Sequence, residues 1–228
     1  MKMIIWKLAD EHDRTHGGCR WGPGVQHNTS GEGELCGPGW THWYTHPLLA
    51  VMLNPCHGNF DLTKAHLWKG EGTPEKFDHG LKVGCRDGRT IKRVPLPKVS
   101  LKSKVRFGIL CAWEVYADKK WRRWARNWLS GKDRSEVAAA MAALVAWARL
   151  VAWAAAGASA AEAASAARLA ASAARLVAWA ASAALGAVGA AVNMGRDLDL
   201  IALAKKAVRD EAAYQRKAAK RGLMKGEK

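Results

Sequence analysis

The sequence predicts an α+β protein, in which a small module of strands and turns precedes an alanine-rich antiparallel helical bundle or hairpin. Short apolar segments separated by Gly and Pro dipeptides fill residues 1–97, which is typical of strands joined by turns. Residues 118–129 repeat with the period of an amphipathic helix. After Ser130-Gly131 the composition changes abruptly to alanine, the residue with the highest helix propensity. We therefore divide the 228 residues into domains 1–132 and 133–228.

Within the first module, the apolar segments Met3–Leu8 and Thr90–Leu96 predict strands. Pro47–Leu53 predicts a short helix, because proline fits the first helical turn and Pro55 disfavours helix at the residue before it. We expect residues 1–97 to contain at most one or two such helices.

Residues 98–107 fit two different structures. Apolar residues occupy odd-numbered positions and basic residues occupy even-numbered ones. The apolar residues are Val99, Leu101, Val105 and Phe107, and the basic residues are Lys98, Lys102, Lys104 and Arg106. This alternation is typical of a half-buried strand. The same segment could instead begin a helix that is capped by Ser103 and continues through Tyr116. We expect a strand to about Lys102 and a helix after it.

Asp118–Leu129 predicts a helix with two opposed faces. Its apolar face contains Trp121, Trp124, Ala125 and Trp128. Its basic face contains Lys119, Arg122, Arg123 and Arg126, which follow the same helical spacing on the other side. We expect the tryptophans to be core residues, because they lie opposite the cations.

The alanine-rich half carries helix start signals and an internal repeat. Capping boxes stand at Asp133–Glu136 and Ser159–Glu162. The heptad RLVAWAA at 149–155 recurs at 175–181. These features predict antiparallel helices that begin at Asp133–Ser135 and Ser159, with breaks near Gly157 and Gly186–Gly195. We expect a last helix from about Asp197 to Arg221, and self-association through the alanine-rich surfaces.

Positive charge is concentrated in the middle of the chain. The formal net charge is +16, and residues 80–135 carry 16 Lys and Arg against 4 Asp and Glu, a balance of +12. Clustered basic residues attract polyanions. We therefore expect the basic segment 80–132 to bind nucleic acid or an acidic host protein through Lys98, Lys102, Lys104, Arg106, Lys119, Arg122, Arg123 and Arg126. The alternative is a solvated surface that covers the tryptophan core.

All eight histidines lie within residues 12–79. Together, Cys36, His42, Cys56 and His57 could hold zinc, which structural sites bind with four Cys or His ligands. The spacing lacks the paired knuckles of zinc modules, so the alternative is a set of unliganded polar and core residues. We expect no cofactor, with zinc as the single alternative.

The enzymatic alternative is a metal-dependent nuclease or nucleotide-modifying enzyme in this histidine-rich module. His46 could act as its base, Asn54 or Asn59 could orient that base, and His57 or His66 could bind the metal. Thr45 stands where such nucleases carry an acidic residue or a histidine beside the base, which argues against this assignment.

Cysteine usage and hydropathy indicate an intracellular protein. Five cysteines without a CxxC pair give poor support for a disulfide framework. The N-terminus becomes charged after a few apolar residues, unlike a secretory signal. Leu176–Gly195 has no formal charge and is long enough to span a bilayer, but its alanine and glycine content gives a modest transfer energy. We therefore expect no membrane partner.

The first part of the chain contains four distinctive segments: RTHGGCRWGPGV (14–25), LCGPGWTHWYTHPLLAVMLNP (35–55), VRFGILCAWEVY and NWLSGKDRS. Together these segments resemble a family of uncharacterised tailed-bacteriophage proteins. These proteins join a short N-terminal domain to alanine-rich helical repeats. The resemblance covers about the first 135 residues, with Leu35–His42 as its most specific part. It implies a phage origin and no established reaction.

The leading hypothesis is a non-enzymatic phage accessory protein, located in the host cytoplasm or associated with the virion, that binds nucleic acid or a host complex through its basic segment. A minor virion or membrane-associated structural protein is a further alternative to the enzyme.

Overall fold

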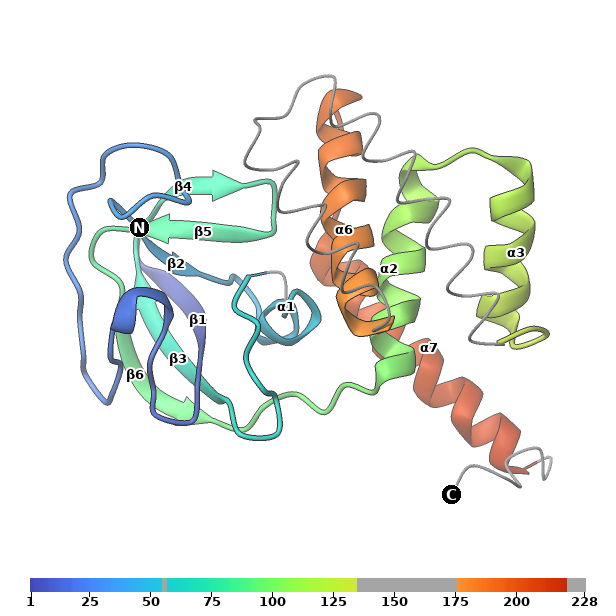
Figure 1. Cartoon of the computed structure of the whole chain (residues 1–228), viewed down its shortest axis with the longest axis horizontal. Coiled ribbons are helices and arrows are strands. Elements are labelled where there is room, and N and C mark those ends of the chain that lie inside the picture. Colours follow the sequence, from blue (N-terminus) through green and yellow to red (C-terminus); the bar gives the residue numbers. More distant parts are fainter. Residues whose placement is uncertain (55–56, 135–175, 221–228) are drawn as a thin grey trace. The chain divides into compact units, whose positions relative to one another are not determined.

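The computed structural model describes residues 1–54, 57–134 and 176–220, with the backbone alone for residues 176–184. The chain divides into two units (Figure 1). The first unit comprises Met1–Lys98 with Asp197–Ile201, and the second comprises Val99–Arg196 with Ala202–Lys228. The described strands belong to the first unit and the long helices to the second, which confirms the α+β class.

The first unit contains two antiparallel sheets of three strands each. One has the order β1 (Met3–Ala9), β3 (His66–Gly72), β6 (Arg89–Val94). The other has the order β2 (Thr41–Trp43), β5 (Lys82–Cys85), β4 (Pro74–Asp78). Short helices η1 (His16–Gly18) and α1 (Pro47–Met52) complete the unit, so the predicted strands and the predicted proline-led helix are confirmed.

Alternate residues of β1 point into the core of this unit. Ile5 and Ala9 join a buried cluster with residues of both sheets and of the loop after β1: Trp21, Trp43, Trp68, Val83 and Cys85. Lys7 has the same parity and is also buried. In the strand register Lys7 stands opposite Trp68, and Trp68 stands opposite Arg93.

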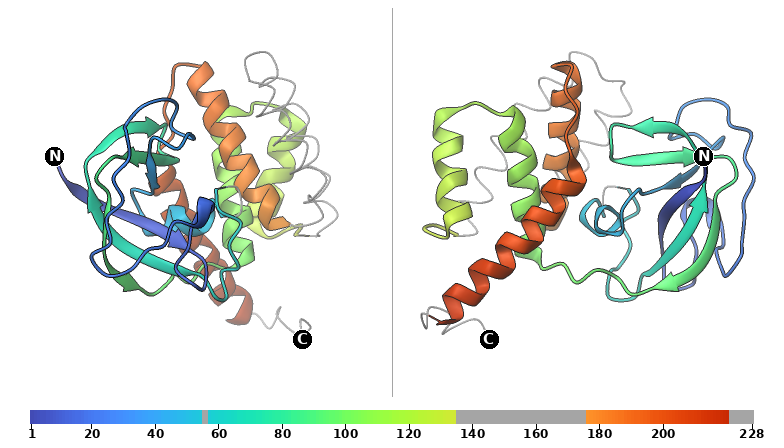
Figure 2. Two further views of the ribbon diagram at one scale, coloured as in Figure 1. Left: turned by 60° about the vertical axis from the view of Figure 1, so that its left-hand side comes forward. Right: turned by 180° about the vertical axis from the view of Figure 1, so that it is seen from behind.

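The second unit contains α2 (Leu101–Val115), α3 (Lys119–Ser130), α6 (Leu176–Asn193) and α7 (Leu200–Lys220), the last of which begins in the first unit. Figures 1 and 2 show α6 running beside α2, with which it makes extensive contact. The expected break falls at Gly195, whose φ of +67° suits glycine, and the expected last helix is α7.

Three sequence expectations concern residues that the structure does not describe or describes incompletely. The described residues end at Arg134, within the expected helix start at Asp133–Ser135, and the expected start at Ser159 and break near Gly157 lie outside them. Within 176–220 the described backbone contains no strand. Of the helices that the structure describes, none is long and apolar enough to cross a bilayer.

The boundary between the units differs from the predicted one, and so does the structure of residues 98–107. Both α2 and α3 belong to the second unit, since α2 packs against α6. The predicted strand to about Lys102 is wrong: α2 begins at Leu101, and the side chain of Ser100, not Ser103, caps it by accepting from Ser103 N at 3.0 Å. Because α2 is buried on all sides from Ser103 to Ala112, its alternating polarity does not mark a solvent face.

Candidate nucleic-acid interface

Helix α3 begins and ends at residues suited to those positions. The Asp118 carboxylate caps its first turn by accepting from Trp121 N at 2.8 Å. Gly131 ends it in the left-handed conformation, with φ of +81°, and Lys132 N then donates to Asn127 O at 2.9 Å. The twelve residues between these caps contain no acidic side chain.

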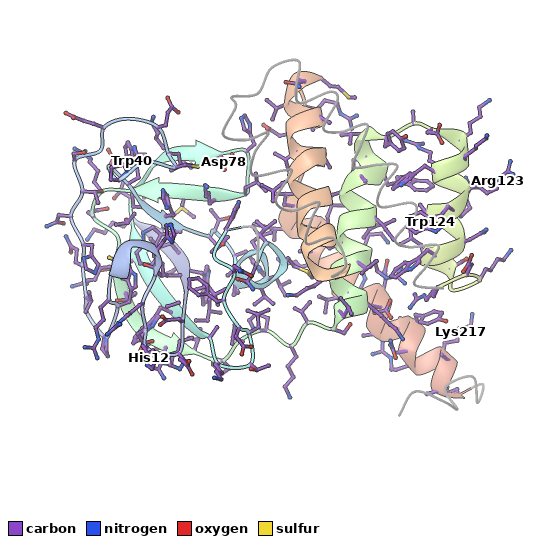
Figure 3. All side chains as sticks on the ribbon, viewed as in Figure 1. His12, Trp40, Asp78, Arg123, Trp124 and Lys217 are labelled. Atoms are coloured by element: carbon purple, nitrogen blue, oxygen red, sulfur yellow. The ribbon has the colours of Figure 1, made fainter. Side chains whose placement is uncertain are left out.

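The apolar face of α3 is a core surface of the second unit. Trp121, Ala125 and Trp128 are 4%, 0% and 3% exposed, and they form one cluster with three residues of α2: Val105, Ile109 and Ala112. The half-buried Trp124 packs against this cluster, on the side of α3 that faces α2 (Figure 3). The prediction of a tryptophan core is therefore confirmed.

The opposite face of α3 carries a group of exposed cations that we call the α3 cationic surface: Lys119, Lys120, Arg123 and Arg126. Arg123 extends away from α2 (Figure 3). Within the described part of the chain, these four side chains make no ion pair. Lys120 was not among the predicted binding residues, although its exposed position beside Lys119 adds to the same surface.

Arg122 has a different role from the one predicted. Its Nε donates to Tyr116 O at 2.8 Å, its Nη2 donates to Trp113 O at 3.1 Å, and its guanidinium lies over the Trp113 ring at 5.0 Å. These carbonyls belong to the end of α2, where backbone oxygens lack helical partners. Arg122 therefore links α3 to α2, and its two bonded nitrogens are not free for phosphate.

The predicted basic row 98–106 is divided by burial. Lys98 is exposed and Lys102 is half-buried. Lys104 and Arg106 are only 5% and 4% exposed, which contradicts their assignment to a phosphate-binding surface. Burial lowers the pKa of Lys104 to about 8.

Arg106 belongs to a buried charge cluster. Its Nε and Nη2 donate to the Glu211 carboxylate at 3.2 and 3.1 Å, and its Nη2 also donates to Leu129 O at 3.1 Å. Arg134 donates to the other oxygen of Glu211 at 2.8 Å. Burial alone would raise the pKa of Glu211, but bonds from Arg134 and Gln215 and the charge of Arg106 hold it below its usual value. One carboxylate thus stabilises two interior guanidinium groups.

Three of the four predicted zinc ligands, Cys36, His42 and His57, lie within the described residues. Cys36 Sγ lies 3.2 Å from Lys82 Nζ, and His42 Nε2 hydrogen-bonds the Leu35 carbonyl. Burial, with the charges of Lys82 and His42, lowers the pKa of His57 to about 3. Cys56 lies outside the described residues, and among those described no three His, Cys, Asp or Glu side chains form a metal-binding group.

Three of the residues considered for a nuclease are held by hydrogen bonds within the first unit. His46 caps α1, with Nδ1 accepting from Leu48 N at 3.2 Å. Asn54 closes a loop by bonding both the N–H and the carbonyl of Phe60 at 2.9 Å. His66 bonds Asp13 at 2.8 Å, a contact that sequence reasoning missed.

Sequence reasoning also missed a lysine in the core of the first unit. Lys7 Nζ lies 4.4 Å and 4.6 Å from the ring centroids of Trp21 and Trp43. Burial lowers the pKa of Lys7 to about 7, against an opposing effect of Cys19 and Cys85. The parity of β1, which aligns Lys7 with Ile5 and Ala9, was the available signal.

Comparison of the chain with protein-family models, curated proteins and solved structures finds no match. The described side chains are therefore the basis for assigning a function. Among them, the α3 cationic surface places four exposed cations on one helix whose other face is anchored in the core.

Proposed function

We propose that this protein binds nucleic acid through the α3 cationic surface. The observation that carries the proposal is the division of α3 into a buried tryptophan face and an exposed face of four cations without acidic partners in the described part of the chain. Because the buried face anchors the helix, the cations need no folding transition to meet a phosphate backbone.

The dimensions and chemistry of this surface favour binding without sequence preference. Lys119 and Arg126 are seven residues apart, which corresponds to about 10 Å along a helix and to several phosphates of a duplex. Trp121 and Trp128 are buried and thus not available to stack on bases. Phosphate contacts position a protein but carry no sequence information.

The proposal includes a phage origin. The resemblance to tailed-bacteriophage proteins supports an accessory role in the host cytoplasm or the virion, with self-association through the alanine-rich helices. An acidic host protein could be attracted by the same cations, and the experiment below separates the two partners.

The test replaces Lys119, Arg123 and Arg126 with Gln and measures duplex binding by fluorescence anisotropy over a salt series. Each lost phosphate contact should flatten the slope of log K against log salt by about 0.9, so the expected change is up to about 2.7. Folding should stay intact, because the three side chains are exposed.

A matched variant changes three exposed cations of α7, Lys205, Arg216 and Lys217, to Gln. It removes the same charge and should affect the slope less than the α3 variant. Equal effects of the two variants would contradict a specific role for α3. No duplex affinity in the parent protein at about 50 mM salt would refute nucleic-acid binding and favour an acidic protein partner.

A further inference from the structure

Three residues from distant parts of the sequence converge at one end of the β1–β3–β6 sheet. The Asp13 carboxylate accepts from His66 Nδ1 at 2.8 Å and from Trp68 Nε1 at 2.8 Å through Oδ1, and from Arg93 Nη2 at 2.7 Å through Oδ2. Asp13 follows β1, His66 begins β3, and Arg93 lies on β6. One carboxylate thus fixes the orientation of both an imidazole and a guanidinium.

The backbone of Asp13 is itself held in an uncommon conformation. Its φ is +60°, in the left-handed region that few residues other than glycine adopt. Asp13 N donates to Asp10 O at 3.1 Å, and Asp13 O accepts from Trp21 N at 2.8 Å. The loop is therefore built around the position of this carboxylate.

The orientation set by Asp13 brings two nitrogens together on the side away from it. His66 Nε2 and Arg93 Nη1 are 3.3 Å apart, a long contact for a hydrogen bond. When His66 is neutral, Arg93 donates across this gap. When the imidazole is protonated, both nitrogens carry hydrogens, and an anionic oxygen placed between them would accept from both.

Exposure and charge favour such an occupant. The Arg93 side chain is 49% exposed and that of His66 is 23% exposed, so solvent reaches the pair, whereas Asp13 is 18% exposed. A protonated His66 and Arg93 carry two positive charges against the single charge of Asp13. The remaining positive charge matches an oxyanion.

We propose that His66 and Arg93, positioned by Asp13, bind the terminal phosphate of a small phosphomonoester. This site consists of residues of the first unit and is independent of the proposed nucleic-acid binding by α3. A monoester dianion is favoured over a phosphodiester because two cationic donors face one point and a diester carries only one charge.

The experiment measures binding of inorganic sulfate, inorganic phosphate, a nucleoside 5′-monophosphate and dimethyl phosphate to the full chain by NMR of the imidazole nitrogens. Sulfate and the nucleoside monophosphate should both bind and shift the imidazole resonances of His66. Dimethyl phosphate should bind more weakly than the monophosphate.

The variant Arg93→Met should weaken sulfate and monophosphate binding about tenfold or more. Its matched control is Arg89→Met, since Arg89 lies on the same strand, is 48% exposed and pairs with Glu71 at 2.6 Å. Arg93→Lys keeps the charge and should restore part of the affinity, which guards against loss of folding in the Met variant. None of these three variants should alter duplex binding. An incorrect anion-site proposal can therefore be distinguished from an incorrect α3 proposal.

Equal affinities in the Arg93→Met and Arg89→Met variants would overturn the proposal. Resonances of His66 that do not respond to any of the anions would overturn it as well. Either outcome would identify the three residues as a closed hydrogen-bond network that attaches the Asp13 loop to the sheet.

Discussion

Replacing Lys7 with Met should stabilise the protein at neutral pH, although it removes a charged residue from a strand. The ammonium lies in the apolar core of the first unit, against Trp21 and Trp43. A methionine of similar length fills the same space without the cost of desolvating a charge.

The size of the expected stabilisation follows from the pKa of Lys7. Lowering it from 10.5 to about 7 corresponds to about 5 kcal/mol when the amine is fully protonated, and to about 4 kcal/mol at pH 7. The two ring contacts offset about 1–2 kcal/mol each in favour of the charged form. The expected net gain for Lys7→Met is therefore up to about 2 kcal/mol at pH 7.

The sign of the pH dependence is also determined. Between about pH 7 and pH 10 the unfolded chain keeps Lys7 protonated while the native chain does not, so the stability of the wild-type protein rises with pH. The advantage of the variant should shrink over the same range. Urea denaturation at several pH values measures this difference, with Lys2→Met at an exposed position as control. A variant less stable than wild type by the same amount at every pH would refute the reasoning.

Two further predictions concern the second unit. Glu211→Gln should lower the free energy of unfolding by about 3–5 kcal/mol, because it leaves two interior guanidinium groups without their shared negative charge. The control is Asp210→Asn at the less buried neighbouring residue, which should change the free energy of unfolding little in the same urea titration. Gly131→Ala should cost about 1–3 kcal/mol more than Gly33→Ala. Both glycines have positive φ, but a Cβ at Gly131 would overlap the Tyr214 ring and one at Gly33 would meet open space, so equal losses of melting temperature would contradict this account.

The features that sequence analysis predicted correctly depend on short-range patterns. The opposed faces of α3 follow from residues three and four positions apart, and α1 follows from the placement of Pro47. Lys7 carried a comparable local signal, since it alternates with Ile5 and Ala9 along β1.

Apart from Lys7, whose local signal was overlooked, the missed features depend on partners far along the chain. Arg106 is stable in the interior because of Glu211, which is 105 residues away, and no local pattern reports that pairing. Asp13 lies 53 residues from His66 and 80 residues from Arg93, so the candidate anion site exists only once the sheet has formed. Around Lys104, the alternation of charge and apolar residues was compatible with strand and helix alike, and burial from all sides decided between them.

The division between buried and exposed cations limits the strength of the proposed nucleic-acid binding by one chain. Part of the positive charge in the basic segment serves the interior, as with Arg106 on Glu211 and Arg122 on the carbonyls of α2. Four contacts from the α3 cationic surface would give a slope of at most about −3.6 in log K against log salt, and an affinity that falls about a hundredfold between roughly 50 and 200 mM salt. A single surface of this kind would be weakly occupied at physiological salt. If several chains joined through their alanine-rich helices, the number of phosphate contacts would increase without any change in α3. A slope of log K against log salt clearly steeper than about −3.6 would therefore indicate that more than one copy binds the same duplex.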